Sequence, residues 1–299
     1  MKFVIVTGGA GFIGSNLIEK LLVEDKSIKI ISLDNYSSGS KKNHIKSDRV
    51  RYIKGDTIQF NKYFNKLKKK IVTIFHFGEF SRIAQSFENH DICLKSNING
   101  SYAVIDFCLK NNIKIIYSAT SATLGNEKNP HRSPYSYSKF HNLNLLINLN
   151  KWHGLNCSVV YFYNVYGSRQ IKNHSMSAVL GIFETKYSEN EKLPVVIPGT
   201  QERNFTHIND TIDCVLKVYK KKSPIHYAVF NDKFYSILNV AKMFTKNIKY
   251  IKSRPGERFQ SKIVTNFRGV KIHHFKAKTS LSQYIKDFKK SLKEKKFKK

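Results

Sequence analysis

Cysteine is scarce in this 299-residue sequence, and its few copies lie far apart inside apolar segments. They form no Cys-x-x-Cys pair, which excludes the common zinc-binding and disulfide-rich patterns and indicates buried thiols in a reducing compartment. His273 and His274 are adjacent, but the sequence offers no further ligands near them, so we expect surface residues and no metal site. The four cysteines are Cys93, Cys108, Cys157 and Cys214.

Proline, glycine and long hydrophobic runs are scarce as well. The sequence has 6 prolines and 15 glycines, and 41% of its residues are hydrophobic, which excludes a disordered or fibrous chain. No apolar run approaches the length of a membrane span, and the chain begins directly with a predicted strand. We therefore expect no signal peptide, no membrane partner and a cytoplasmic location. The length suits one α/β domain with a smaller appendage.

Acidic residues are few, with 21 Asp and Glu against 52 Lys and Arg, and the net charge is +31. Such a charge is typical of proteins that bind nucleic acid or anionic membranes. Only nine of the basic residues are arginine, however, and the lysines are spread among many Asn and Ile residues, which indicates a coding bias. We expect no nucleic acid partner. A functional basic patch at residues 66–70, 220–222 or 289–299 remains the alternative to solvated surface.

The first residues predict a strand, a glycine-rich turn and a helix. Phe3 to Val6 form an unbroken apolar run, and apolar residues recur at helical spacing after the turn. Glycines at such a turn let the backbone approach a pyrophosphate, which then lies on the free amides of the helix. The pattern predicts a dinucleotide site. Its expected contacts are Gly8, Gly11, Phe12, Ile13 and Gly14.

An acidic residue follows the second predicted strand, which covers residues 28–34. Asp34 lies about 20 residues after Gly14, the spacing at which an acid accepts hydrogen bonds from the adenosine ribose. An acid there repels a 2′-phosphate, so we expect NAD and not NADP as the cofactor. Asn35 is expected to contact the cofactor beside it.

Strands and helices continue to alternate, which predicts a Rossmann-type doubly wound parallel sheet. Asp56 and Thr57 follow the third strand at its carboxyl end, where ligands bind in such sheets, so we expect them near the adenine. The further strands are predicted over residues 50–53, 71–77 and 114–118, and a helix over 101–112.

A candidate catalytic group follows the fifth strand. Ser133 can cap a helix and Pro134 suits its first turn, which places Tyr135 and Lys139 four residues apart on one face. An ammonium near a phenol stabilises the phenolate, so we expect a lowered pKa for Tyr135 and a role as general base. Thr120, at the end of the fifth strand, can share the hydrogen bond to a substrate oxygen.

Two motifs, TGGAGFIG at residues 7–14 and YSYSK at 135–139, resemble those of the extended short-chain dehydrogenase/reductases. Within that family the chain is most similar to nucleotide-sugar epimerases and dehydratases of the UDP-glucose 4-epimerase type. The resemblance implies an NAD-binding Rossmann domain over residues 1–166, completed by part of 204–232. It also implies a smaller C-terminal α/β substrate domain, mainly 167–299 with a basic tail, and a homodimer.

The same resemblance assigns further site residues. Thr120 takes the catalytic Ser/Thr position, and Asn97 matches an Asn beside the central helix. The segments YFYNVYG (161–167), GTQERNFTHIND (199–210) and RPGER (254–258) resemble the substrate-binding stretches of the family. They imply a cofactor contact at Phe162, and the resemblance also implies that Lys139 binds the nicotinamide ribose. They also imply that Asn164, Arg203 and Arg254 bind the diphosphate and that Glu257 binds the nucleoside ribose.

The chain also departs from the family pattern. Ser121 and Ala122 stand where dehydratases carry an Asp-Glu pair and decarboxylases carry a Glu, which favours C4 epimerisation of a UDP-hexose through a 4-keto intermediate. Tyr161 stands where an Arg is common, and Asn204 replaces an Asp. The alternatives are another nucleotide-sugar enzyme (an ADP-heptose epimerase, a reductase or a dehydratase) or a basic nucleotide- or RNA-binding protein without catalysis.

Overall fold

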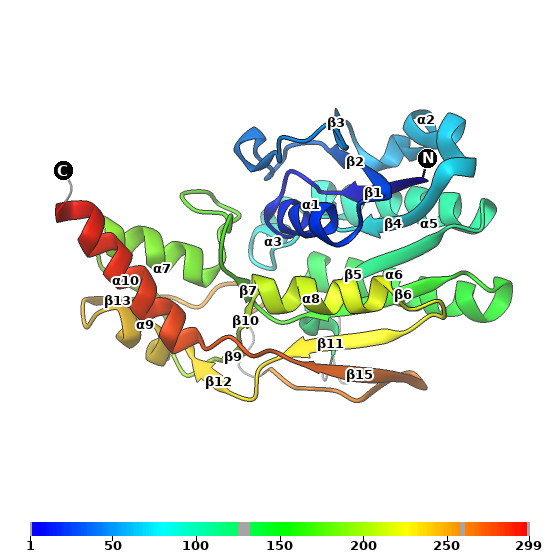
Figure 1. The fold of residues 1–299 in the computed structure, drawn as a ribbon. Coiled ribbons are helices and arrows are strands. Elements are labelled where there is room, and N and C mark those ends of the chain that lie inside the picture. Colours follow the sequence, from blue (N-terminus) through cyan, green and yellow to red (C-terminus); the bar gives the residue numbers. More distant parts are fainter. Residues whose placement is uncertain (1, 125–131, 258–260, 298–299) are drawn as a thin grey trace.

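The computed structural model describes residues 2–124, 132–257 and 261–297. Its centre is a nine-stranded sheet whose strands are parallel except for the last pair, with helices on both faces (Figure 1). This arrangement confirms the predicted doubly wound fold. In spatial order the strands are β3 (Val50–Lys54), β2 (Ile28–Asp34), β1 (Lys2–Thr7), β4 (Ile71–His76), β5 (Lys114–Thr120), β6 (Cys157–Phe162), β11 (His226–Phe230), β15 (Val270–Lys276) and β14 (Asn266–Phe267).

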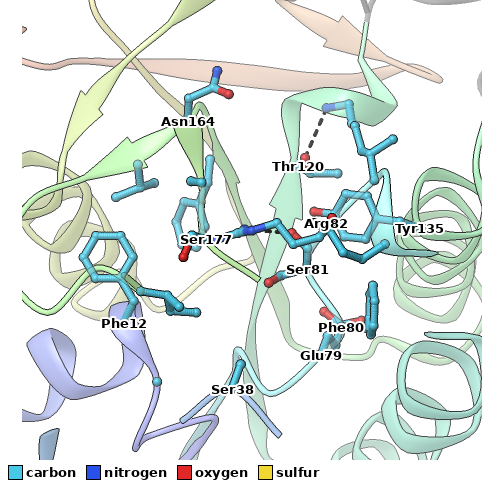
Figure 2. A pocket seen from close by; sticks show the side chains of 18 of the residues that line it. Phe12, Ser38, Glu79, Phe80, Ser81, Arg82, Thr120, Tyr135, Asn164 and Ser177 are labelled. Carbon is cyan, nitrogen blue, oxygen red and sulfur yellow. Dashed lines mark hydrogen bonds between the residues drawn. The ribbon is translucent and has the colours of Figure 1, made fainter. Parts of the chain in front are cut away.

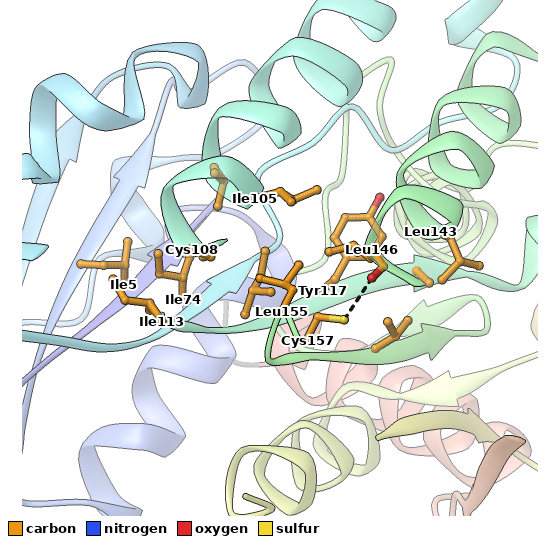
Figure 3. Close-up of a cluster of buried hydrophobic side chains, with 14 of the residues drawn as sticks. Ile5, Ile74, Ile105, Cys108, Ile113, Tyr117, Leu143, Leu146, Leu155 and Cys157 are labelled. Atoms are coloured by element: carbon orange, nitrogen blue, oxygen red, sulfur yellow. Dashed lines mark hydrogen bonds between the residues drawn. The ribbon is translucent and has the colours of Figure 1, made fainter. Parts of the chain in front are cut away.

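Two layers of helices cover the sheet because successive strand residues point to opposite faces. Val4 and Val6 pack toward α1 (Phe12–Glu24) and α8 (Ile208–Tyr219) on one face. Ile5 belongs to the core on the other face, where Figure 3 shows it in one cluster with residues such as Tyr117 and Leu146. The helices of that second layer are α2 (Phe60–Phe64), α5 (Ser101–Lys110) and α6 (Pro134–His153), and the short helices α3 (Gln85–Glu88) and α4 (His90–Leu94) precede α5.

All four cysteines are free and buried, as predicted. Cys108 and Cys157 lie in the core cluster of Figure 3, where the Cys157 thiol donates a 3.5 Å hydrogen bond to the Leu146 carbonyl. Burial raises the pKa of the Cys157 thiol to about 12. These thiols therefore serve as packing groups, because the reactive form of cysteine is the thiolate.

A smaller lobe lies beyond the carboxyl ends of the strands (Figure 1). It has its own core, in which Phe183 and Phe244 are fully buried. Its helices are α7 (Val179–Ser188), α9 (Ile237–Phe244) and α10 (Leu281–Phe297). Its strands pair as β8 (Leu193–Val196) with β13 (Ile248–Ile251), β9 (Glu202–Asn204) with β12 (Phe234–Ser236), and β7 (Val165–Tyr166) with β10 (Thr206–His207).

The chain returns from this lobe to the large sheet twice, through β11 and β15. Asp210 at the start of α8 accepts hydrogen bonds from the amides of Lys278 and Thr279, at 3.1 and 3.0 Å, and so fixes the segment that leads from β15 to α10. The lobe is therefore attached to the sheet through several connections. The predicted domain boundaries, with an NAD-binding domain over residues 1–166 and a substrate domain mainly over 167–299, stay a prediction.

Two residues that depart from the family pattern have local partners that explain them. The buried Tyr161 places its hydroxyl 3.0 Å from Nδ1 of His226 on the neighbouring strand β11. Asn204 donates from its side-chain amide to the carbonyl of Asn231 and accepts from the amide of that residue. An aspartate could make only the second of these bonds, since an ionised carboxylate has no donor.

No helix within the described residues is both long enough and apolar enough to cross a membrane.

Candidate active site

A cavity of about 440 Å³ opens at the carboxyl ends of the parallel strands, between the sheet and the smaller lobe (Figure 2). It collects nearly all of the site residues predicted from the sequence. Asp56 and Asn97 are not part of its lining. The predicted residues that line it are Gly8, Gly11, Phe12, Ile13, Gly14, Asp34, Asn35, Thr57, Thr120, Tyr135, Lys139, Phe162, Asn164, Arg203, Arg254 and Glu257.

The turn between β1 and α1 forms one end of this cavity. Gly8 has φ +70°, a left-handed conformation, and a Cβ atom on Gly14 would lie 2.2 Å from the Gly8 carbonyl oxygen. Helix α1 begins after Gly11 with no side-chain cap and no acidic residue in its first turn among the described residues. Its first amides and positive dipole end therefore suit a pyrophosphate group.

Asp34 ends β2 beside that turn. Its carboxylate accepts hydrogen bonds from the amides of Ala10 at 2.9 Å and Tyr36 at 2.8 Å, while burial raises the pKa of the carboxyl group. Asp56 instead accepts from the amide of Ile58 at 3.0 Å and from the side chain of Asn35 at 3.2 Å. Asp56 thus holds the turn that carries cavity residues, and its contact with an adenine stays a prediction.

Tyr135, Thr120 and Lys139 lie together in the middle of the cavity. The helix that carries Tyr135 begins as predicted: Pro134 occupies its first turn, and the Ser133 hydroxyl accepts a 3.0 Å hydrogen bond from the amide of Ser136. Tyr135 is only 8% exposed. Burial raises its pKa to about 12, whereas a hydrogen bond with Thr120 acts in the opposite direction.

Lys139 does not have the surroundings that the sequence predicts. Its ammonium pairs with the carboxylate of Glu79 and donates to the carbonyl of Ser118. The expectation that Lys139 gives Tyr135 a low pKa is therefore wrong for this arrangement, because burial dominates and the negative charge of Glu79 raises the phenol pKa further.

Glu79 is a functional candidate that the sequence reasoning missed. Its carboxylate accepts hydrogen bonds from the Ser101 hydroxyl at 2.8 Å, the Tyr117 hydroxyl at 3.0 Å and the Asn142 amide at 3.1 Å. Burial alone would raise its pKa, but the charges of Lys139 and His76 and the hydrogen bonds from Lys139 and Ser101 outweigh burial and lower it. The available signal was an acid directly after the fourth predicted strand, at the ligand-binding edge of the sheet.

Asn97 lies behind the cavity, fully buried in a π-helical turn, Lys95–Gly100. Its side chain accepts from the amide of Phe80 at 2.7 Å and donates to the carbonyl of that residue and to the Ser138 hydroxyl, both at 3.0 Å. Asn97 therefore holds the loop after β4 against α6, and its effect on the cavity is indirect.

The opposite end of the cavity carries the residues implied for the substrate diphosphate and ribose. Arg203 forms a 3.1 Å ion pair with Glu257, and Arg254 approaches the same carboxylate at 3.8 Å. Asn164 has φ +33° and donates to the Asn204 carbonyl at 2.8 Å. Two guanidinium groups that share one carboxylate leave a net positive charge, which suits a diphosphate.

Arg82 is a second residue that the sequence reasoning missed. It lies in the loop after β4 and lines the cavity, and its nitrogen end points toward Ser177 (Figure 2). The charge of Arg82 lowers the pKa of Tyr135. Within the described residues, no group of three or more His, Cys, Asp or Glu side chains could hold a metal ion.

Comparisons with known proteins identify the family of this chain. A sequence profile of the NAD dependent epimerase/dehydratase family matches residues 4–231. UDP-glucuronic acid decarboxylase 6 of Arabidopsis thaliana is 27% identical over 236 residues, which cover 72% of this chain and 65% of that enzyme. UDP-glucose 4-epimerase of Mycolicibacterium smegmatis is 26% identical over 230 residues, with 71% and 72% covered. The chain thus matches less than two thirds of the length of the plant decarboxylase.

Solved structures of similar enzymes share the fold. UDP-glucose 4-epimerase of Thermotoga maritima has a TM-score of 0.82 at 23% identity, with 97% of this chain and 99% of that chain covered. UDP-glucuronic acid 4-epimerase of Bacillus cereus has a TM-score of 0.82 at 21% identity, with 98% and 99% covered. At these identities the likeness establishes the architecture.

Proposed function

The chain belongs to the NAD-dependent epimerase/dehydratase family, and on this premise we propose that it interconverts the C4 epimers of a nucleotide sugar, a UDP-hexose. The observation that carries the proposal is the convergence of Tyr135, Thr120 and Lys139 between the glycine turn and the Arg203 end of one cavity. Ser121 and Ala122 offer no acid for the elimination of water or for decarboxylation. Oxidation and reduction at a single carbon is the chemistry that these residues support best.

NAD is the cofactor of this family, and the residues of the chain fit it. The amides at the start of α1 would hold its pyrophosphate, and the Asp34 carboxylate would accept hydrogen bonds from the adenosine ribose. When bound, NAD would supply the hydride acceptor and donor for oxidation and reduction at the sugar C4.

Tyr135 is the only side chain we propose for proton transfer. Its phenol oxygen would take the proton of the sugar 4-hydroxyl and give it back, while Thr120 orients the same oxygen by a hydrogen bond. Because burial raises the phenol pKa to about 12, the reactive phenolate is a minor form at neutral pH. The charge of Arg82, which lowers this pKa, therefore favours the reaction.

We also propose a homodimer in a reducing compartment, the cytoplasm. Ile92 and Tyr102, on the neighbouring helices α4 and α5, are 52% and 56% exposed, which supports a covered apolar face. The four free thiols support the reducing compartment.

The proposed activity is tested by incubating the protein with UDP-glucose, UDP-N-acetylglucosamine and UDP-glucuronate and separating the sugar products. We expect C4 epimers without a dehydrated keto sugar and without one equivalent of NADH. Tyr135→Phe keeps the ring and removes the proposed base, so turnover should fall by about 10² to 10⁴, the typical effect of losing a general base.

Tyr250→Phe is the matched control, since Tyr250 is 54% exposed on β13 outside the cavity. It should turn over at the wild-type rate. An unchanged rate for Tyr135→Phe, or a dehydrated product from the wild type, contradicts the proposed mechanism.

A further inference from the structure

The guanidinium group of Arg82 is held in place by backbone carbonyls. Its Nε donates to the carbonyl of Met176 at 2.6 Å, and one terminal nitrogen donates to the carbonyl of Ser81 at 2.9 Å. These bonds use two of the five N–H donors of the group. The side chain lines the cavity, and Figure 2 shows its nitrogen end beside Ser177.

Arg82 differs from the other cations that line the cavity because it has no carboxylate partner among the described residues. Each of the other cations that line it shares a carboxylate: Lys139 with Glu79, and Arg203 and Arg254 with Glu257. Across the described parts of the chain, no carboxylate lies within ion-pair distance of Arg82. Among the described residues, the phenol of Tyr135 is an anion-forming group that acts on Arg82, and its charge would raise the Arg82 pKa.

It is costly to hold the half-buried guanidinium of Arg82 in the cavity without an anionic partner among the described residues, and burial lowers the pKa of Arg82. A ligand carboxylate would offset this cost, because its two oxygens match the fork of an arginine. The ligand diphosphate does not fit this role. Arg203 and Arg254 already provide two guanidinium groups for it, whereas Arg82 is the arginine whose charge acts on Tyr135, where the sugar ring would react.

We propose that Arg82 binds a carboxylate of the sugar, so that the preferred substrate is a nucleoside-diphosphate hexuronate and not a neutral hexose. This inference rests on the proposed function, because it places the sugar ring at Tyr135 and Thr120. Arg82 is then a specificity-determining residue, and the carbonyls of Ser81 and Met176 fix its orientation.

The experiment compares kcat/KM for UDP-glucuronate and UDP-glucose in the wild type and in Arg82→Gln. We expect the wild type to prefer UDP-glucuronate at least about tenfold. Arg82→Gln should lower kcat/KM for UDP-glucuronate by about 30- to 1000-fold, as for the loss of one partner of a hydrogen-bonded charge pair, mainly through KM. The value for UDP-glucose should fall much less, by about tenfold at most, because a neutral sugar makes no such pair and loses only the effect of the Arg82 charge on the Tyr135 pKa.

Two further variants separate a charge effect from a structural effect. Arg82→Lys keeps the charge without the fork and should retain part of the preference. Arg51→Gln removes an exposed arginine on β3, outside the cavity, and should behave as the wild type with both sugars. If Arg82→Gln does not fold, the preference for UDP-glucuronate over UDP-glucose is compared between the wild type and Arg82→Lys. A weaker preference in Arg82→Lys supports the role of Arg82, and an equal preference contradicts it.

The outcomes for Arg82 and for the proposed function can be told apart. A wild type that prefers UDP-glucose, or an Arg82→Gln that loses both sugars equally, overturns the Arg82 inference and leaves the epimerase intact. Decarboxylation of UDP-glucuronate with Arg82-dependent selectivity overturns the epimerase and supports Arg82. If no sugar is turned over, calorimetry gives the affinities for the two nucleotide sugars. Equal affinities overturn the proposal that Arg82 binds a sugar carboxylate. A preference for UDP-glucuronate that is lost in Arg82→Gln supports the proposal.

Discussion

At Glu79, one buried carboxylate accepts hydrogen bonds from three neighbours and pairs with Lys139. A carboxylate with this many donors stays ionised, which agrees with its lowered pKa. Its negative charge raises the pKa of Tyr135, while Arg82 lowers it. The availability of the phenolate thus depends on a balance of fixed charges, and Glu79 is the acidic member of that balance.

The residue to change is therefore Glu79. Glu79→Gln keeps a hydrogen-bond acceptor and removes the charge that raises the Tyr135 pKa, so the phenolate should form at lower pH. We expect the rising limb of the kcat profile against pH to move to lower pH by about one unit, the order of effect of one nearby charge. The measurement is kcat from pH 6 to pH 10 for both proteins.

Asp106→Asn is the control for that shift, because Asp106 pairs with Lys110 on the solvent side of α5, outside the cavity. A profile of Glu79→Gln that coincides with the wild type, or moves to higher pH, would show that Glu79 does not set the ionisation of Tyr135.

The sequence predicts site residues where the signal is local. The glycine turn, Asp34 after β2 and the spacing of Tyr135 and Lys139 each depend on positions within one or two elements, and the cavity contains all of them. Glu79 and Arg82 could not be assigned in this way. Their partners Lys139 and Met176 lie 60 and 94 residues away in the chain, and only the packing of the loops brings them together.

At the scale of elements, Lys114 joins a strand to a helix. It is the first residue of β5 and is 9% exposed, and its ammonium donates to three carbonyls at the end of α8: Val218 at 3.0 Å, Tyr219 at 2.9 Å and Lys221 at 2.5 Å. A cation at this place satisfies carbonyls that lack helical partners and suits the negative end of the helix dipole. Burial nevertheless lowers the Lys114 pKa to about 8.

Lys114→Met should lower the free energy of unfolding at pH 7 by about 1 to 3 kcal/mol, because it leaves buried carbonyls without a donor. It should also change the pH dependence. The Lys114 pKa is about 8 in the folded chain and about 10.4 in the unfolded chain, so between these values the unfolded state binds more protons. The Lys114 contribution to stability therefore rises with pH across this window and is absent from Lys114→Met.

Urea unfolding of both proteins at pH 7.5 and pH 10 measures this difference. Lys54→Met, at an exposed lysine on β3, is the control and should keep the wild-type pH dependence. Equal stability of Lys114→Met and the wild type at both pH values contradicts the role given to Lys114.

Most elements of the sheet follow from hydrophobic patterns in short windows. The second strand has its predicted bounds, whereas the fifth runs two residues further, to Thr120, and α5 ends two residues earlier, at Lys110. The positions of β11 and β15 are harder to predict. They join the sheet beside β6 only after the chain has passed through the smaller lobe, and pairing between such distant segments depends on tertiary packing.

At the scale of the whole molecule, the net charge of +31 has a physical consequence whatever its origin. Much of it is carried at the surface, for example by the exposed lysines near residues 66–70 and 220–222. Like charges at this density repel one another in the compact state more than in the expanded chain. Basic residues that serve only as solvated surface should therefore reduce stability at low ionic strength.

We expect added salt to stabilise the protein. Between about 20 mM and 500 mM NaCl the Debye length falls from tens of Å to a few Å, which removes most of the repulsion between surface lysines. The melting temperature should rise by about 2 to 5 °C, as for a gain of about 1 kcal/mol in a chain of this size. Replacing Lys66, Lys68 and Lys70 by Glu lowers the net charge by six and should weaken this dependence.

A nucleic-acid-binding surface gives a different result. RNA would then bind the folded protein and raise its melting temperature at low salt, and added salt would remove this effect by displacing the RNA. A melting temperature that falls with NaCl, or one that RNA raises, contradicts the interpretation of the lysines as solvated surface.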